Sequence, residues 1–441
     1  MPLSLPRPVS VAVGKAARTL TRLRGGSGSA FPGLVVEKID PSFLARTLDR
    51  LPHGVVVVSG TNGKTTTTKM VVELLRGQGL KVFTNRSGSN FTRGVVASLL
   101  GEIGISGRLD ADIAVLELDE AHAVHFVRAV KPQHALLLNV MRDQLDRFGE
   151  IDTTAALLRS IASATVQGVV LNREDSRVAA IADTLADQEV RYFGLAPALR
   201  SHFPSDDDLH SATAALSDEA QTDSPADQPQ DSELEADVVL TDLLTQGGTF
   251  RIGGEEVTTD LSVNGAYNTY NAAAALALVR MVMGRGLDSA ALLQSLTEVS
   301  PAFGRGESLT VAGQPLDLVL VKNPSGFRLG LSSFSADGVA TMIAINDDYA
   351  DGRDMSWLWD VSFESLADGV AMVSGVRTYD MALRLSYDDV GIDALEPDLK
   401  IALEAFLAAH PQTPKRIFCT YTAMLSLRRH LSAYTHVEEF A

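Results

Sequence analysis

Val55-Val-Val-Val-Ser-Gly-Thr-Asn-Gly-Lys-Thr-Thr66 is the stretch that decides the fold of this chain. Its apolar half predicts a buried strand, and a glycine-rich turn follows that opens a helix with a Lys-Thr pair. Such a turn points backbone N–H groups and a helix N-terminus at one position, which suits nucleotide phosphates. A glycine turn of purely structural use is the alternative. The expected nucleotide-binding residues are Gly60, Thr61, Asn62, Gly63, Lys64, Thr65 and Thr66.

The spacing of this turn differs from the general P-loop pattern, because Val58 stands where the first glycine belongs. The narrower pattern Gly60-Thr-Asn-Gly-Lys-Thr65 resembles the P-loop of the Mur ligase and folylpolyglutamate synthetase superfamily. Members of that superfamily use ATP to make an amide from a carboxylate. We expect Lys64 to neutralise phosphate charge and Thr65 to help hold Mg²⁺.

Composition limits the remaining possibilities. A chain of 441 residues with 45% hydrophobic content can bury more than one core, so several domains are expected. The single cysteine, Cys419, falls in an apolar run that predicts a buried strand, and it excludes a disulfide framework and a cysteine zinc site. Without a signal peptide or an apolar stretch of about 20 residues, the chain is expected to be cytoplasmic.

Charge is distributed unevenly along the chain, whose net charge of −17 argues against a nucleic-acid partner. Residues 201–250 hold twelve acids and no Lys or Arg. Residues 201–236 are therefore predicted to form an acidic, disordered insert. The first 24 residues, in contrast, carry five basic residues and no acid. Residues 11–23 predict a basic amphipathic helix, which either packs on the protein body or contacts anionic lipid at the inner membrane face.

Alternating strand and helix patterns predict an α/β fold with a mostly parallel sheet. We assign residues 1–50 to a basic N-terminal segment and residues 51–300 to an ATP-binding domain. The predicted strands of that domain are 55–59, 81–84, 113–118, 134–140, 168–171, 190–193, 238–243, 248–252 and 255–261. A hinge at 303–307 is expected to lead into a smaller Rossmann-like α/β domain, 301–441. Its predicted strands are 316–321, 341–345, 369–373 and 416–419.

Acidic residues follow two of the predicted strands, at the sheet edge that carries the P-loop. Glu117 is the expected Mg²⁺ ligand, as a hard oxygen donor. Glu120 is either a second acidic ligand or simply the start of the next helix. Asp143 and Asp146 are candidates for positioning a metal or water, or for capping a turn. Gln144 stands where many superfamily relatives have a histidine that helps hold a second metal, which makes two-metal catalysis doubtful.

Three further residues resemble nucleotide-contacting positions of the superfamily. Asn268 and Asn271 match its Asn-x-x-Asn motif and lie three residues apart, so they share a helix face. Arg305, in the expected hinge, resembles the arginine that approaches the ATP phosphates when the domains close.

The chain also resembles one branch of the superfamily, the MurT family, which provides the ligase-like subunits of lipid II isoglutaminyl synthases. Five segments carry this resemblance: 84–90, 142–147, 322–326, 346–360 and 374–380. The branch implies a Mur-ligase-like central ATPase domain with ATP and Mg²⁺. Only about 55 residues precede the P-loop, which fits a lipid-linked substrate. Some MurT proteins have a four-cysteine zinc ribbon, but the acidic insert here has no cysteine, so no zinc is expected.

This resemblance implies that the D-glutamate α-carboxylate of the lipid II stem peptide is amidated to D-isoglutamine through an acyl phosphate. Ammonia would come from a GatD-type glutaminase subunit, and an Asp of this chain would complete its catalytic triad. We choose Asp354, with Asp351 and Asp360 as alternatives. Trp357 and Trp359 are either core residues or contacts to that partner. The alternative functions are an amino-acid-adding ligase and a non-catalytic nucleotide-binding scaffold.

Overall fold

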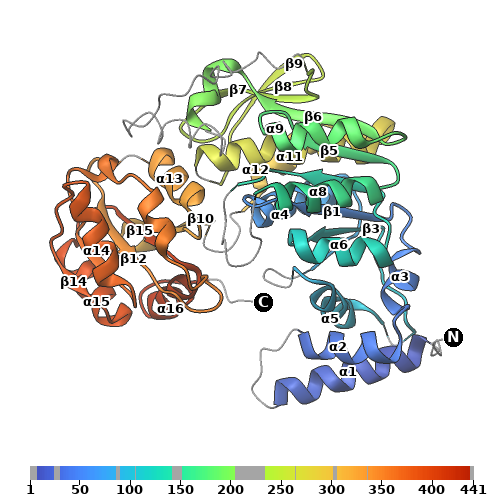
Figure 1. The fold of residues 1–441 in the computed structure, drawn as a ribbon, viewed down its shortest axis with the longest axis horizontal. Coiled ribbons are helices and arrows are strands. Elements are labelled where there is room, and N and C mark those ends of the chain that lie inside the picture. Colours follow the sequence, from blue (N-terminus) through green and yellow to red (C-terminus); the bar gives the residue numbers. More distant parts are fainter. Residues whose placement is uncertain are drawn as a thin grey trace.

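The computed structural model describes residues 7–23, 30–85, 90–104, 106–141, 151–203, 234–263, 265–300, 305–334 and 336–437. These residues form two α/β units, each built around its own sheet (Figure 1). The α/β class expected from the sequence is confirmed.

The larger sheet has nine strands within the described residues, in the order β2-β3-β1-β4-β5-β6-β7-β8-β9. Every pair from β2 to β7 is parallel, whereas β7, β8 and β9 pair antiparallel. The strands are β1 (Val55–Ser59), β2 (Val82–Thr84), β3 (Ile113–Glu117), β4 (His134–Leu137), β5 (Gly168–Asn172), β6 (Glu189–Leu195), β7 (Val238–Leu243), β8 (Gly248–Ile252) and β9 (Glu255–Thr259).

Helices cover both faces of this sheet (Figure 1). The α-helices of this unit in the described ranges are α1 (Arg7–Leu23), α2 (Ala30–Ile39), α3 (Phe43–Leu48), α4 (Lys64–Gly77), α5 (Thr92–Glu102), α6 (Glu120–Ala129), α8 (Ile151–Ala164), α9 (Ser176–Ala179), α11 (Ala266–Met283) and α12 (Ser289–Glu298). None of the helices in the described ranges combines the length and the apolar character that spanning a bilayer requires.

The position of strand β1 explains why the stretch 55–66 begins with four valines. Val56 and Val58 face a core with α4, α11 and α12, while Val55 and Val57 face a second core with α1–α3, α5, α6 and α8. Successive side chains of a strand point to opposite faces, so a strand covered on both sides needs a continuous apolar run. The continuous run of four valines therefore fits the centre of a parallel sheet.

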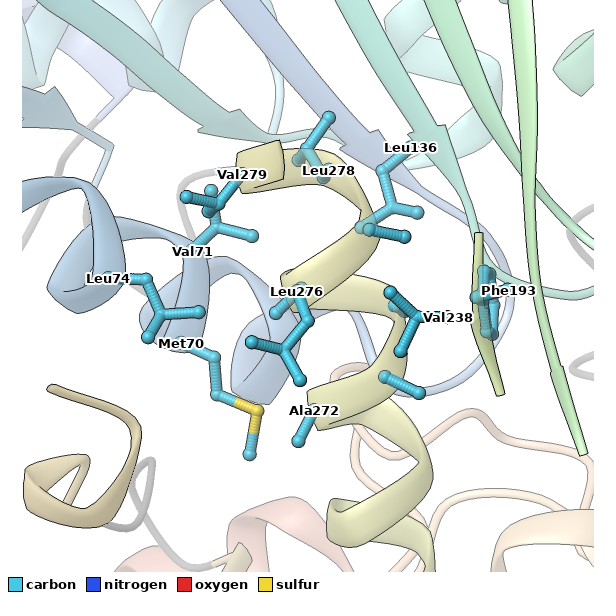
Figure 2. Close-up of a cluster of buried hydrophobic side chains, with 14 of the residues drawn as sticks. Met70, Val71, Leu74, Leu136, Phe193, Val238, Ala272, Leu276, Leu278 and Val279 are labelled. Atoms are coloured by element: carbon cyan, nitrogen blue, oxygen red, sulfur yellow. The ribbon is translucent and has the colours of Figure 1, made fainter. Parts of the chain in front are cut away.

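Helix α11 is buried almost all round, between α4 and the sheet (Figure 2). Small residues of α11, such as Ala272, let the helix pack close to α4 and the sheet. Leu276 and Val279 belong to the same buried core as Met70 of α4. This packing fixes the start of α11 beside the P-loop.

The smaller sheet has six strands within the described residues, in the order β10-β11-β15-β12-β13-β14. Its strands are β10 (Arg305–Val311), β11 (Gln314–Leu320), β12 (Ala340–Ala344), β13 (Met372–Ser374), β14 (Leu395–Glu396) and β15 (Lys415–Cys419). Its helices are α13 (Pro324–Ser333), α14 (Thr378–Tyr387), α15 (Leu399–Ala409) and α16 (Tyr421–Leu431). Cys419 is fully buried in β15, as expected.

The expected hinge at 303–307 is wrong in part, because Arg305 already begins β10. Strand β10 pairs antiparallel with β11, which gives its backbone N–H and C=O groups partners despite the glycines. The predicted strand 134–140 is too long, since β4 ends at Leu137 and the next residues turn toward the P-loop. The predicted strand 369–373 begins too early, because β13 starts at Met372.

Candidate nucleotide site

The P-loop turn needs glycine for two different reasons. Gly60 has a φ of 136° and Gly63 a φ of 84°, a backbone conformation that side chains disfavour. A Cβ at Gly63 would also lie 2.6 Å from Oδ1 of Asn271, at the start of α11. The turn therefore brings the N-terminus of α4 directly against the Asn-x-x-Asn helix.

Asn139 holds the P-loop in place from the neighbouring strand end. Its carbonyl oxygen accepts a hydrogen bond from the Thr61 N–H at 3.0 Å, and its Oδ1 accepts one from the Asn62 N–H at 2.8 Å. Its Nδ2 in turn donates to the Asn62 carbonyl oxygen at 3.1 Å. The loop is thus pre-organised by a residue to which the sequence analysis gave no role. A polar residue directly after an apolar strand was the signal available.

Lys64 is buried at the first position of α4, with its ammonium group over the loop. Its Nζ donates to the carbonyl oxygens of Gly60 and Thr61, and lies 3.3 Å from Oε1 of Glu120. Glu120 is the first residue of α6, where an acid is favoured by the helix dipole, and its side chain is buried. Glu120 therefore starts a helix, which was one of its two predicted roles. Its side chain also pairs with Lys64.

Thr65 and Glu117, the two residues predicted to hold Mg²⁺, lie within hydrogen-bonding distance of each other. The Thr65 hydroxyl donates to Oε1 of Glu117 at 2.9 Å, at the end of β3. Asn85 fixes the backbone of Glu117 by exchanging two hydrogen bonds with it, at 2.8 and 2.9 Å. Within the described ranges no three His, Cys, Asp or Glu side chains gather into a metal site. A metal here would need further oxygens from phosphates and water.

A pocket lies between the two units, beside the P-loop. Asn268 and Asn271 both line it, in agreement with their shared helix face. Arg305 begins β10, and its backbone pairs with Val319, which lines the same pocket; its side chain lies outside the described residues. The lining residues are Asn62, Gly63, Thr66, Gly265, Tyr267, Asn268, Asn271, Val319, Leu320, Lys322, Gly326, Leu329, Gly330, Ser333 and Phe334.

The smaller unit reaches the P-loop through two adjacent residues. Nζ of Lys322 donates to the Thr61 carbonyl oxygen at 3.2 Å. Asn323 is fully buried, and its Nδ2 donates to Oδ1 of Asn62 at 3.0 Å. Its Oδ1 also caps α13 by accepting from the Gly326 N–H at 2.7 Å. A second cationic side chain thus lies at the loop, and the sequence analysis gave it no role.

The candidate triad residues differ in their surroundings. Asp351 is buried and accepts hydrogen bonds from the backbone N–H groups of Thr422 and Asp348, which ties its loop to α16. Asp354 is exposed, and its Oδ1 accepts from the Ser356 N–H at 2.9 Å. Hydrogen bonds from the side chain and the backbone of Ser356 lower the pKa of the Asp354 carboxyl, so it stays ionised. Asp360 is exposed at the end of the 3₁₀ helix Ser356–Asp360.

The two tryptophans differ in exposure. Trp357 is buried in the core of the smaller unit, against Phe327. Trp359 is 48% exposed and its ring contacts Tyr387 at a centroid distance of 5.0 Å. Asp143, Gln144 and Asp146, and residues 204–233 of the acidic insert, lie outside the described residues.

Comparison with known proteins agrees with this geometry. The Mur ligase middle domain matches residues 58–279, and the MurT ligase C-terminal domain matches residues 320–424. The chain is 30% identical to the MurT subunit of lipid II isoglutaminyl synthase (glutamine-hydrolysing) from Streptococcus pneumoniae, over 98% of both chains. The chain belongs to the MurT family.

A second MurT family member, the corresponding subunit from Staphylococcus aureus, is 25% identical over 87% of this chain and 88% of that protein. Among solved structures, the MurF ligase from Thermotoga maritima in complex with ADP has the same fold, with a TM-score of 0.65 and 17% identity. That match covers 91% of this chain and 84% of the solved one. As a MurT family member, the chain is an enzyme of the ATP-dependent ligase class.

Proposed function

We propose that this MurT family member amidates the α-carboxylate of D-glutamate in the lipid II stem peptide. The carboxylate attacks the γ-phosphorus of ATP, which releases ADP and forms an acyl phosphate. Ammonia then attacks the acyl carbon, phosphate leaves with one former carboxylate oxygen, and D-isoglutamine remains. A carboxylate is a poor electrophile because both oxygens share its negative charge, so phosphorylation is the step that makes amide formation feasible.

The observation that carries this proposal is that Lys64 and Lys322 both donate to the Thr61 carbonyl oxygen. This P-loop position lies beside the pocket that Asn62 and Lys322 line, and Asn62 also pairs with Asn323 of the smaller unit. Phosphoryl transfer needs positioned cationic groups more than covalent chemistry by the protein. The P-loop N–H groups and Lys64 would bind the phosphates, and Lys322 would add charge from the smaller unit. The buried amide pair would keep the two units together around the bound nucleotide.

Thr65 and Glu117 suit Mg²⁺, because a hydroxyl and a carboxylate are hard oxygen donors. Mg²⁺ is commonly held by one or two carboxylates together with substrate phosphates, so this small donor set is sufficient. When bound, the ion supplies neutralisation of the phosphate charge. Asn85 would keep Glu117 aimed at this position.

Ammonia has to come from a partner in this proposal, since the one cysteine of the chain is unsuited to glutamine hydrolysis. Cys419 is fully buried, and burial raises the pKa of its thiol well above the usual range. A GatD-type glutaminase would supply the nucleophile. Asp354 fits the role of orienting the partner's histidine better than Asp351, because it is exposed and ionised.

An exposed aromatic surface on α14 contacts the segment that holds Asp354, which supports a partner at this position. Tyr379, Leu383 and Tyr387 follow one face of α14 and are 68%, 53% and 70% exposed. Trp359 packs against Tyr387, which joins that face to the segment holding Asp354. Exposed aromatic clusters are typical of protein interfaces. We propose that the glutaminase subunit docks here.

An amino-acid-adding ligase would use the same acyl phosphate with an amine substrate. A UDP-N-acetylmuramoylalanine–D-glutamate ligase of Burkholderia ambifaria is 28% identical, but it matches only 66% of this chain. One reconstitution separates the two functions. The chain and a glutaminase subunit are supplied with lipid II, ATP, Mg²⁺ and either glutamine or a set of amino acids. With glutamine, mass spectrometry should show that the α-carboxylate of the stem-peptide D-glutamate has become an amide. A stem peptide lengthened by one amino acid would contradict the proposal.

A further inference from the structure

Helix α1 packs on the body of the larger unit through only one of its faces. Ser10, Val11, Gly14 and Ala17 are buried on that face. Ser10 donates to the buried Asp40 at 2.7 Å, which fixes the helix against the end of α2. A Cβ at Gly14 would clash with side chains of α2 and α5, so the contact is close. The helix lies at the outer edge of the molecule, away from the sheet (Figure 1).

The opposite face of α1 is exposed and almost wholly apolar. Val9, Val13 and Leu20 are 43%, 39% and 58% exposed, and their spacing places them in one stripe along the helix. Thr19 is the only polar residue among those exposed between positions 8 and 20; the others are Pro8, Val9, Ala12, Val13, Ala16 and Leu20. Phe31 of α2 is 54% exposed as well. A helix that met only water would carry polar residues along this stripe.

Charge distinguishes α1 from the rest of the chain. Four basic residues and no acid lie in its sequence, although the whole chain has a net charge of −17. Lys15 is half-buried at the border between the two faces, where its aliphatic stem can cover apolar surface while the ammonium group reaches outward. An apolar stripe with a lysine at its border fits a helix that lies in the interface of an anionic bilayer.

We propose that the outward face of α1 binds the surface of an anionic lipid bilayer, with Val9, Val13 and Leu20 entering the headgroup region. Lys15, at the border of this face, contacts lipid phosphates. The helix alone binds reversibly, since one interfacial helix is a weak anchor. This surface is inferred from α1 itself and does not depend on the proposed function, but it would hold the enzyme where a lipid-linked substrate resides.

Vesicle flotation of the full chain tests this inference. Vesicles of phosphatidylcholine with and without phosphatidylglycerol are compared at low and high salt. We expect the chain to float with the anionic vesicles, and less so at high salt because charge attraction is screened. Lys15→Gln should weaken that binding about fivefold, since one basic residue near an anionic surface contributes ~1 kcal/mol. Flotation that ignores lipid charge, or no flotation, would overturn the inference.

Two matched substitutions distinguish binding through this surface from non-specific adsorption of the chain to vesicles. Leu20→Glu should abolish flotation, whereas Ile401→Glu on α15, at a position 54% exposed, should leave it unchanged. Thermal melting shows whether both variants stay folded. If Leu20→Glu floats like the wild type, the surface assignment is wrong. If light scattering instead finds a dimer that Leu20→Glu dissociates, the face joins two copies of the chain and the lipid inference is overturned.

Amidation assays keep this inference separate from the proposed function. Leu20→Glu should retain wild-type turnover with lipid II in detergent micelles and lose turnover with lipid II in anionic vesicles. Equal loss in both would overturn a membrane role for the residue. If the wild type floats but amidates in neither medium, the proposed function fails while the membrane surface stands.

Discussion

Nζ of Lys64 lies 3.3 Å from Oε1 of Glu120, and both side chains are buried. The P-loop lysine is therefore paired with an acid from the start of α6. This pair holds the ammonium group at the loop. It also couples the activity and the stability of the larger unit, because either residue alone would leave a buried charge without its partner.

Replacing Lys64 should separate these two effects. Lys64→Gln should lower amidation about a hundredfold or more, since a group that stabilises transition-state charge is lost. It should also cost about 3 kcal/mol of stability, because Glu120 keeps a buried charge. The double variant Lys64→Gln/Glu120→Gln should recover stability in thermal melts but not activity. Lys69→Gln, on the same helix, is the control, and a Lys64→Gln enzyme with normal turnover would contradict the assignment.

Asn323 should control how the two units close on the nucleotide. Asn323→Ser keeps an N-cap for α13 but loses the amide pair with Asn62. One net hydrogen bond contributes ~0.5–1.5 kcal/mol, so we expect kcat/KM for ATP to fall about threefold to tenfold with little loss of stability. Steady-state kinetics at saturating lipid II measures this. An unchanged kcat/KM would exclude the pair from nucleotide binding.

Asp354 should matter for glutamine and not for ammonia. In the reconstituted complex, Asp354→Asn should reduce glutamine-dependent amidation about a hundredfold or more, as loss of an orienting carboxylate does in other triads. Amidation with added ammonium chloride should stay near the wild-type rate. Asp360→Asn is the matched control in the same segment. Glutamine use that survives Asp354→Asn would move the role to another residue.

His134 should make the stability of the chain depend on pH. It is 7% exposed at the start of β4, and burial lowers the pKa of its imidazole to about 4 from 6.5. A folded pKa below the unfolded one means that the unfolded chain takes up the proton first as pH falls. Stability should thus drop between pH 6.5 and 4, by about 2 kcal/mol from this residue at pH 5. His134→Gln should flatten that drop in thermal melts, and the exposed His125→Gln should not.

The sequence predicted those parts of the site that local patterns specify. A strand, a glycine turn and a helix start follow each other along the chain, so the P-loop was recognisable, and Glu117 could be placed because it ends a neighbouring parallel strand. The spacing of Asn268 and Asn271 likewise placed both on one face. These relationships depend on periodicity and on strand ends, which a sequence displays directly.

Contacts between distant segments were not predictable in this way. Asn62 and Asn323 are 261 positions apart, and nothing in either local pattern specifies that they pair. Trp357 and Trp359 both lie in one short 3₁₀ helix, so which of them is buried depends on its packing against α13 and α14. Arg305 appeared to lie in a hinge because glycines flank it, whereas tertiary pairing with β11 makes it a strand residue.

The central claim, that the carboxylate is activated as an acyl phosphate, is tested most directly by isotope transfer. Lipid II with isotopically heavy oxygen in the D-glutamate α-carboxylate is amidated by the complex with ATP and glutamine. The account predicts that one heavy oxygen per turnover appears in the released inorganic phosphate, as measured by mass spectrometry. Amidated product accompanied by phosphate that contains only ordinary oxygen would contradict it.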